Sequence, residues 1–93
     1  MRFGPLVEEV VLDEVEGDYL FKVLRGRAAW RGVTVRFESV VYQSVGGPNV
    51  SVSVPEEEVE RLLGMGFTRE DVAGLEQRLQ EKILNGEVRI GEG

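Results

Sequence analysis

The chain has 93 residues, with 17 Asp and Glu against 11 Lys and Arg, a formal net charge of −6 and neither Cys nor His. This length predicts one domain over residues 1–93, and the mixture of 42% hydrophobic and 30% charged residues is typical of a soluble globular protein. The lack of Cys and His excludes thiolate zinc sites, Cys–His pairs and Ser–His–Asp triads, so we expect no enzyme and no metal or cofactor site.

A β-hairpin is predicted at the start of the chain. Residues 6–15 (LVEEVVLDEV) and 19–25 (YLFKVLR) are rich in β-prone residues and flank a Gly17-Asp18 turn. If these two residues form the loop, the numbers of any two facing residues add up to 35. Apolar residues then face apolar residues, and acidic residues face basic ones. The predicted pairs are Val15 with Leu20, Leu12 with Val23, Val11 with Leu24, Asp13 with Lys22 and Glu8 with Arg27.

A second hairpin is predicted in the middle of the chain. Before it, residues 26–32 (GRAAWRG) are bracketed by glycines and predict a loop or bulge. Residues 33–45 predict a strand whose alternation blurs at residues 39–42, which indicates a bulge or burial on both sides. Turn residues 46–49 (GGPN) follow, and residues 50–54 alternate Val with Ser, as in a short strand with one buried face.

Two helices are predicted next. Pro55 suits the first position of a helix, the glutamates after it match the helix dipole, and Gly64 ends that helix. Thr68 caps a second helix, which Asn85 and the next glycine end, and residues 87–90 (EVRI) predict a short closing strand. The second helix carries one unbroken apolar stripe of Val72, Leu75, Leu79 and Ile83.

Strands that precede helices predict an α+β fold. It comprises a four-stranded antiparallel sheet of two consecutive hairpins, two C-terminal helices packed on one face, and a short final strand. Val40, Val41, Tyr42 and the first strand offer apolar groups to both faces of this sheet. Because extended exposed apolar surface marks an interface, we expect a domain that acts through protein contacts, as a homodimer or with another protein.

Residues 59–72 (VERLLGMGFTREDV) resemble part of a ubiquitin-associated domain, in which a Met-Gly-Phe loop after the first helix helps to bind the apolar patch of ubiquitin. That family continues with a short second helix, a loop and a third helix, whereas the stripe here runs unbroken to Ile83. We therefore predict that Gly64 and Gly66 end the first helix and that Phe67 packs onto Val72 or its neighbours as a hydrophobic staple.

The segment 19–37 contains five basic and four aromatic residues and no acid. Interleaved Arg and aromatic residues are typical of surfaces that bind single-stranded nucleic acid, so a nucleic-acid-binding module is the alternative function. However, residues 8–18 hold six acids that would neutralise this segment across the hairpin, and the net charge also disfavours a polyanion. The candidate binding surface comprises Lys22, Arg25, Arg27, Trp30, Arg31 and Arg36.

Trp30 has two interpretations. Trp is a common anchor of protein interfaces, but a single Trp between glycines suits a buried corner of the core equally well. The glutamates of residues 56–60 are interpreted as solvated acids at a helix start rather than as metal ligands.

Nothing in the sequence predicts contact with a membrane. No run approaches the roughly 18 apolar residues of a membrane span, and the first residues do not follow the pattern of a signal peptide. Since Cys is absent, export to an oxidising compartment is not indicated, and we expect a cytoplasmic protein. The scarcity of thermolabile residues suits a thermophile, although a GC-rich genome would produce the same Arg, Val and Gly bias.

Overall fold

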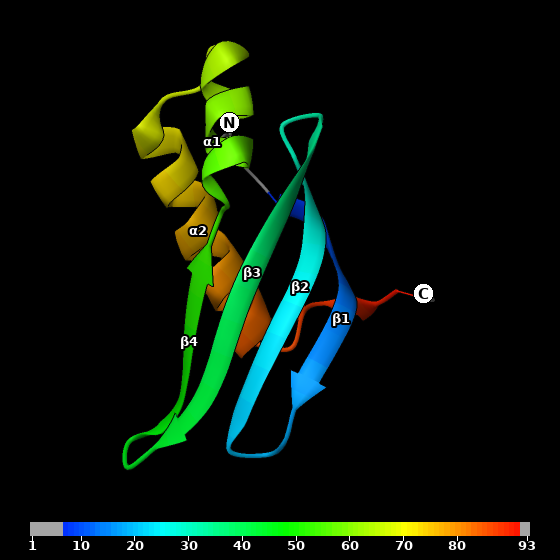
Figure 1. Cartoon of the computed structure of the whole chain (residues 1–93), viewed down its shortest axis with the longest axis vertical. Coiled ribbons are helices and arrows are strands. Elements are labelled where there is room, and N and C mark those ends of the chain that lie inside the picture. The colour runs from blue at the N-terminus through cyan, green and yellow to red at the C-terminus, as the bar shows by residue number, and fades with distance from the viewer. Residues whose placement is uncertain (1–6, 92–93) are drawn as a thin grey trace.

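The computed structural model describes residues 7–91, so Leu6, the first residue of the predicted first strand, lies outside it. The elements are β1 (Val7–Gly17), β2 (Phe21–Trp30), β3 (Val33–Ser44), β4 (Gly47–Ser53), α1 (Glu56–Gly64), α2 (Arg69–Leu84) and β5 (Arg89–Ile90). Four strands therefore precede two helices and a short last strand, which confirms the predicted α+β fold (Figure 1).

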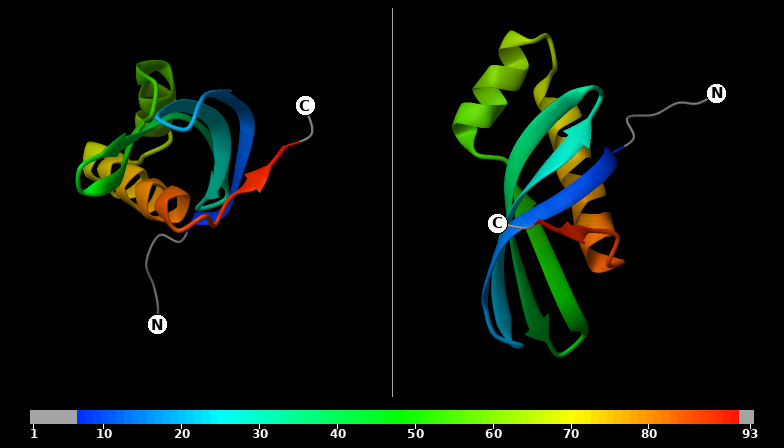
Figure 2. Two further views of the ribbon diagram at one scale, coloured as in Figure 1. Left: turned by 90° about the horizontal axis from the view of Figure 1, so that it is seen from below. Right: turned by 90° about the vertical axis from the view of Figure 1, so that its right-hand side faces the viewer.

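The five strands form one sheet in the order β4-β3-β2-β1-β5. β1 to β4 form an antiparallel meander, whereas β5 pairs in parallel with β1 at Val11 and Leu12. The sheet is curved, and α2 runs along its concave side (Figure 2). We call the face toward α2 the inner face and the opposite one the outer face.

The predicted register of the first hairpin is wrong, because its loop is longer than two residues. Gly17 stays in β1 with a φ of 113° and faces Lys22, so residues 18–20 form the loop. The Asp18 carboxylate closes this loop by accepting hydrogen bonds from the backbone N–H groups of Leu20, at 2.9 Å, and Phe21, at 3.2 Å. A bulge in the second half of β1 shifts the register again. The observed pairs are Val15 with Leu24, Leu12 with Gly26 and Val11 with Arg27.

The predicted loop at residues 26–32 is instead mostly the continuation of β2. The strand extends to Trp30, and only Arg31 and Gly32 form the turn, with φ values of 51° and 79° that are typical of a two-residue type I′ hairpin turn. Gly26 lies inside the sheet, where an added Cβ would stand 2.2 Å from a carbonyl oxygen of β1. This glycine therefore permits a close approach of two strands and does not mark a loop.

β3 contains no bulge at residues 39–42. Its pairing with β2 is continuous over ten residue pairs. The alternation blurs because Ser39 occupies a buried inner position, where its hydroxyl donates a hydrogen bond to the carbonyl oxygen of Ser51 at 2.8 Å, while Val40 occupies an outer position. The Val and Ser strand is confirmed as β4, although it begins earlier than predicted, at Gly47.

The helix boundaries lie close to the predicted caps. The Thr68 hydroxyl accepts a hydrogen bond from the N–H of Asp71 at 3.1 Å, and the Asp71 carboxylate accepts one from the N–H of Thr68 at 2.9 Å, so both ends of a capping box are present. Gly66, with a φ of 104°, reverses the chain after α1. Pro55 precedes the first residue of α1, and α2 is unbroken over its 16 residues. Residues 7–91 therefore do not contain the three-helix arrangement of a ubiquitin-associated domain.

α1 covers an edge of the sheet that no strand of residues 7–91 occupies. β4 pairs with β3 only from Glu38 onward, so the first half of β3 has an unpaired side. At this edge the Glu58 carboxylate accepts a hydrogen bond from the N–H of Arg36 at 2.8 Å, and the Arg61 guanidinium donates one to the carbonyl oxygen of Thr34 at 2.8 Å. Two side chains of α1 thus satisfy backbone groups that an edge strand would otherwise satisfy.

The hydrophobic core lies between the inner face and the two helices. Its largest fully buried side chains are Trp30, Phe37, Leu62, Leu75 and Leu79. The core does not extend along the whole sheet, because the β1–β2 and β3–β4 loops project beyond the C-terminal end of α2 (Figure 1). We call this projecting part, residues 15–24 and 39–50, the open end.

Candidate functional site

Four arginines predicted to bind a partner are already paired with acids. Arg25, Arg27 and Arg36 lie on the outer face of the sheet, where they alternate with buried inner residues of β2 and β3. Arg31 lies apart from them, in the β2–β3 turn. The acids that neutralise them come from β1, from β3 itself and from both helices.

The central pair of arginines is held by the strands on either side. Nε of Arg25 lies 3.3 Å from Glu38 of β3, and Nη1 lies 3.5 Å from Glu14 of β1. Arg27 donates two hydrogen bonds to Asp13, at 3.0 and 2.9 Å. The hydrogen bond with Glu38 raises the pKa of Arg25 above its ordinary value, and the one with Asp13 does the same for Arg27. These charges are therefore balanced within the chain.

The other two arginines are paired with the helices. Nη2 of Arg36 lies 3.5 Å from Glu57 and 3.9 Å from Glu58, both in α1. Arg31 lies 3.6 Å from Asp71 in the first turn of α2. Because each arginine has an acid of its own, the four do not form a positively charged surface clear of acids.

Trp30 belongs to the core. Its exposed fraction is 0%, and its ring stacks on Phe67 with a centroid distance of 4.8 Å. The Arg31 guanidinium covers this aromatic pair, 5.2 Å from the Trp30 centroid and 5.9 Å from that of Phe67. Of the two interpretations, burial is therefore the one observed, and Trp30 does not contribute to an exposed binding surface. Phe67 lies in the α1–α2 turn and contacts this ring, a contact that the staple prediction did not include.

Lys22 differs from every other candidate residue. It is the one basic residue within 7–91 that makes no ion pair, since the nine others each lie within 4.0 Å of a carboxylate oxygen. It also points to the inner face, two residues before the buried Leu24, and it faces Val41 of β3. An unpaired lysine therefore stands among apolar neighbours.

The open end carries most of the exposed apolar surface. Nine large apolar side chains are exposed in residues 7–91, and six of them lie in the open end. Two more, Leu84 and Ile90, adjoin its inner face. The predicted register of the first hairpin was wrong and misplaced β1 relative to β2, so it could not show that these side chains lie together. The six are Val15, Tyr19, Leu20, Phe21, Tyr42 and Val45.

The open end has a separate apolar surface on each face. On the outer face, Phe21 pairs with Tyr42 and Val23 pairs with Val40, and we call these four residues the outer patch. Phe21 and Tyr42 are exposed by 53% and 42%. On the inner face lies a cavity of about 310 Å³, lined by ten apolar residues and Lys22, which we call the groove. No helix or strand of the described chain covers either surface.

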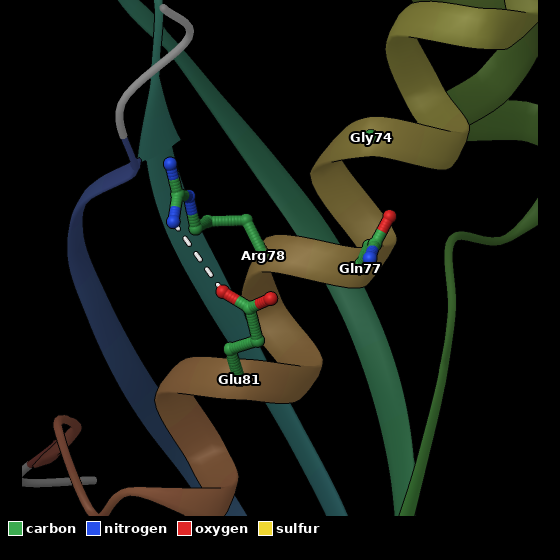
Figure 3. A pocket seen from close by; sticks show the side chains of 4 residues that line it. All are labelled: Gly74, Gln77, Arg78 and Glu81. Carbon is green, nitrogen blue, oxygen red and sulfur yellow. Dashed lines mark hydrogen bonds and ion pairs between the residues drawn. The ribbon is translucent and has the colours of Figure 1, made fainter.

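A second hollow, on the solvent side of α2, is lined by Gly74, Gln77, Arg78 and Glu81, and the last two pair with each other at 3.3 Å (Figure 3). All four come from one helix. Because its charged groups already satisfy one another, this hollow is a weaker candidate than the groove.

Two other kinds of feature are absent from residues 7–91. They contain no cluster of three His, Cys, Asp or Glu side chains placed to hold a metal ion. None of their helices has the length and apolar character needed to cross a membrane. Comparisons of the chain with protein-family models, with curated proteins and with solved structures gave no match.

Proposed function

We propose that this protein is a non-enzymatic cytoplasmic domain that acts through protein contacts and forms a homodimer through the outer patch. The observation that supports the proposal is the outer patch itself: Phe21 pairs with Tyr42 and Val23 with Val40, on a part of the outer face that no helix of residues 7–91 covers. Side chains that are this apolar and lie side by side on a sheet are stabilised when a second surface removes them from water.

A second copy of the chain is the partner that best suits this patch. A two-fold axis at the outer patch would place Phe21 and Tyr42 of one copy on the same residues of the other, in an isologous contact of two sheets. The charged side chains beside the patch are Glu16, which faces Val23, and Arg25. They lie 3.9 Å apart, and Arg25 also pairs with Glu14 and Glu38, so the contact would bury no unpaired charge there. The net charge of −6 on each copy opposes association, and added salt should strengthen the dimer.

The dimer is tested by light scattering after size-exclusion chromatography. We expect a particle of twice the chain mass of 10.4 kDa for the unchanged protein. Tyr42→Glu places a charge in the centre of the contact and should weaken the dimer by at least about tenfold. The matched control is Met65→Glu, because Met65 is also exposed, by 52%, but lies in the α1–α2 turn. A monomer at high concentration and high salt would contradict the proposal, as would a Tyr42→Glu variant that dimerises like the unchanged protein.

Nucleic-acid binding remains the alternative proposal and has weaker support. Arg25 donates a hydrogen bond to Glu38, and Arg27 donates two to Asp13. A phosphate of the nucleic acid would have to displace these carboxylates to bind either arginine. We expect no mobility shift with single-stranded RNA or DNA even at low salt. A salt-dependent shift that the double variant Arg25→Ala/Arg31→Ala abolishes would favour this alternative over the homodimer.

A further inference from the structure

We infer that the groove binds a small amphipathic monocarboxylate, with its hydrocarbon body in the groove and its carboxylate on Nζ of Lys22. The site lies on the inner face of the open end, opposite the outer patch. The inference therefore goes beyond the proposed dimer and does not depend on it.

The fold leaves this groove open for a simple reason. α2 ends at Leu84, and the turn after it carries the chain to β5 at the edge of β1, while the strands continue past the helix (Figures 1 and 2). Leu84 and Ile90 form one wall, and Val15, Val41 and Pro48 lie on the sheet side. The resulting volume of about 310 Å³ is near the lower end of the range for sites that bind small molecules, roughly 300–1,000 Å³.

Lys22 gives the groove its preference for an anion. Small-molecule sites are mostly apolar and orient the ligand with a few polar groups, and here the only polar side chain of the lining is this lysine. Lys22 alternates along β2 with the buried Leu24, so it stands on the inner face at the solvent-exposed mouth of the groove. Its ammonium group pairs with no carboxylate of residues 7–91, so it is free to form a charge-assisted hydrogen bond with the carboxylate of a ligand whose hydrocarbon body lies on the apolar walls.

The lining selects the type of anion. Lys22 offers one positive charge, which a single carboxylate balances, and the ten apolar residues suit a hydrocarbon body better than a polar one. A peptide is also disfavoured, because the apolar walls offer no partner to its amide groups. These features favour an alkyl or aryl chain with one terminal carboxylate.

Titration of the ¹⁵N-labelled protein with decanoate, below its micelle concentration, tests the inference. We expect saturable shifts of the amide signals of Val41, Leu84 and Ile90. Lys22→Met keeps the length of the side chain and removes its charge, and it should weaken decanoate binding about tenfold, as for the loss of one charge-assisted contact. Decanol, which has the same chain without the charge, should bind both proteins equally weakly.

The matched control is Lys82→Met, because Lys82 is the only other lysine, pairs with Glu87 at 3.5 Å and does not line the groove. This variant should bind decanoate as the unchanged protein does. The inference would be overturned if decanoate shifted none of the groove signals at millimolar concentration, or if Lys22→Met left its affinity unchanged. Repeating the titration with Tyr42→Glu separates the two proposals, since groove binding should survive even if the dimer does not form.

Discussion

Replacing Trp30 with Ala is expected to lower the free energy of unfolding by about 4 kcal/mol, which is typical of a large aromatic side chain removed from a core. The ring has an exposed fraction of 0% and lies against Phe67, so its loss would leave a cavity between β2 and the α1–α2 turn. The Arg31 guanidinium would lose its contact with the Trp30 ring at the same time and keep only the one with Phe67. Urea denaturation followed by circular dichroism measures the change.

Two variants make this measurement decisive. Trp30→Phe should cost less than about 2 kcal/mol, because the indole N–H has no hydrogen-bond partner within the described residues and its removal leaves no group unpaired. Val45→Ala, in the exposed β3–β4 turn, should change stability by less than about 0.5 kcal/mol. If Trp30→Ala destabilised the chain no more than Val45→Ala while weakening the dimer, Trp30 would be an interface residue and its placement in the core would be wrong.

Local signals allowed the C-terminal half to be predicted from sequence. The Thr68 cap, the reversal near Gly66 and the stripe of α2 each depend on residues a few positions apart, so their effects are visible in a short window of sequence. The Val and Ser alternation of β4 belongs to the same class. This explains why the order of the elements was predicted correctly.

The register of the sheet depends on features that a short window of sequence does not reveal. The Asp18 carboxylate lengthens the first loop by hydrogen bonding to backbone that follows it, and the bulge near Asp13 then shifts the pairing. Gly26 appeared to mark a loop, although its role is to let β1 approach β2 closely. A shift of register changes which residues share a face, so the wrong register could not show which side chains of β1 and β2 lie together at the open end.

The candidate site separates into two kinds of residue once the pairs are known. Arg25, Arg27, Arg31 and Arg36 stabilise contacts between elements, and their acids come from segments distant in sequence. Lys22 lacks such an acid and was grouped with them only because it lies in the same basic segment. The sequence correctly predicted that acids of residues 8–18 neutralise bases of residues 19–37. The individual pairs, Lys22 with Asp13 and Arg27 with Glu8, were wrong.

Replacing Glu58 with Ala is expected to lower the free energy of unfolding by about 2 kcal/mol at neutral pH. The carboxylate is 4% exposed, accepts the N–H of Arg36 at the open edge of β3, and pairs with Arg61 at 2.9 Å. Its loss would leave a backbone donor of β3 without a partner and would free α1 from that edge. Glu60→Ala is the control, because Glu60 lies on the same helix but is exposed and makes no ion pair within residues 7–91.

The same carboxylate predicts how stability depends on pH. The hydrogen bond from Arg61, together with the N–H of Arg36, lowers the pKa of Glu58 below its ordinary value of 4.5 despite burial. A lowered pKa in the folded state means that the carboxylate contributes its full stabilisation above about pH 4.5 and loses it as the pH falls toward the folded-state value. Urea unfolding of Glu58→Gln should therefore show lower stability than the unchanged protein at pH 7 and a shallower decline below pH 4.5. Part of the decline should persist, because the Thr68 N–H lowers the pKa of Asp71 in the same direction. Parallel acid profiles for Glu58→Gln and the unchanged protein would mean that Glu58 does not hold α1 to the edge of β3 through its charge.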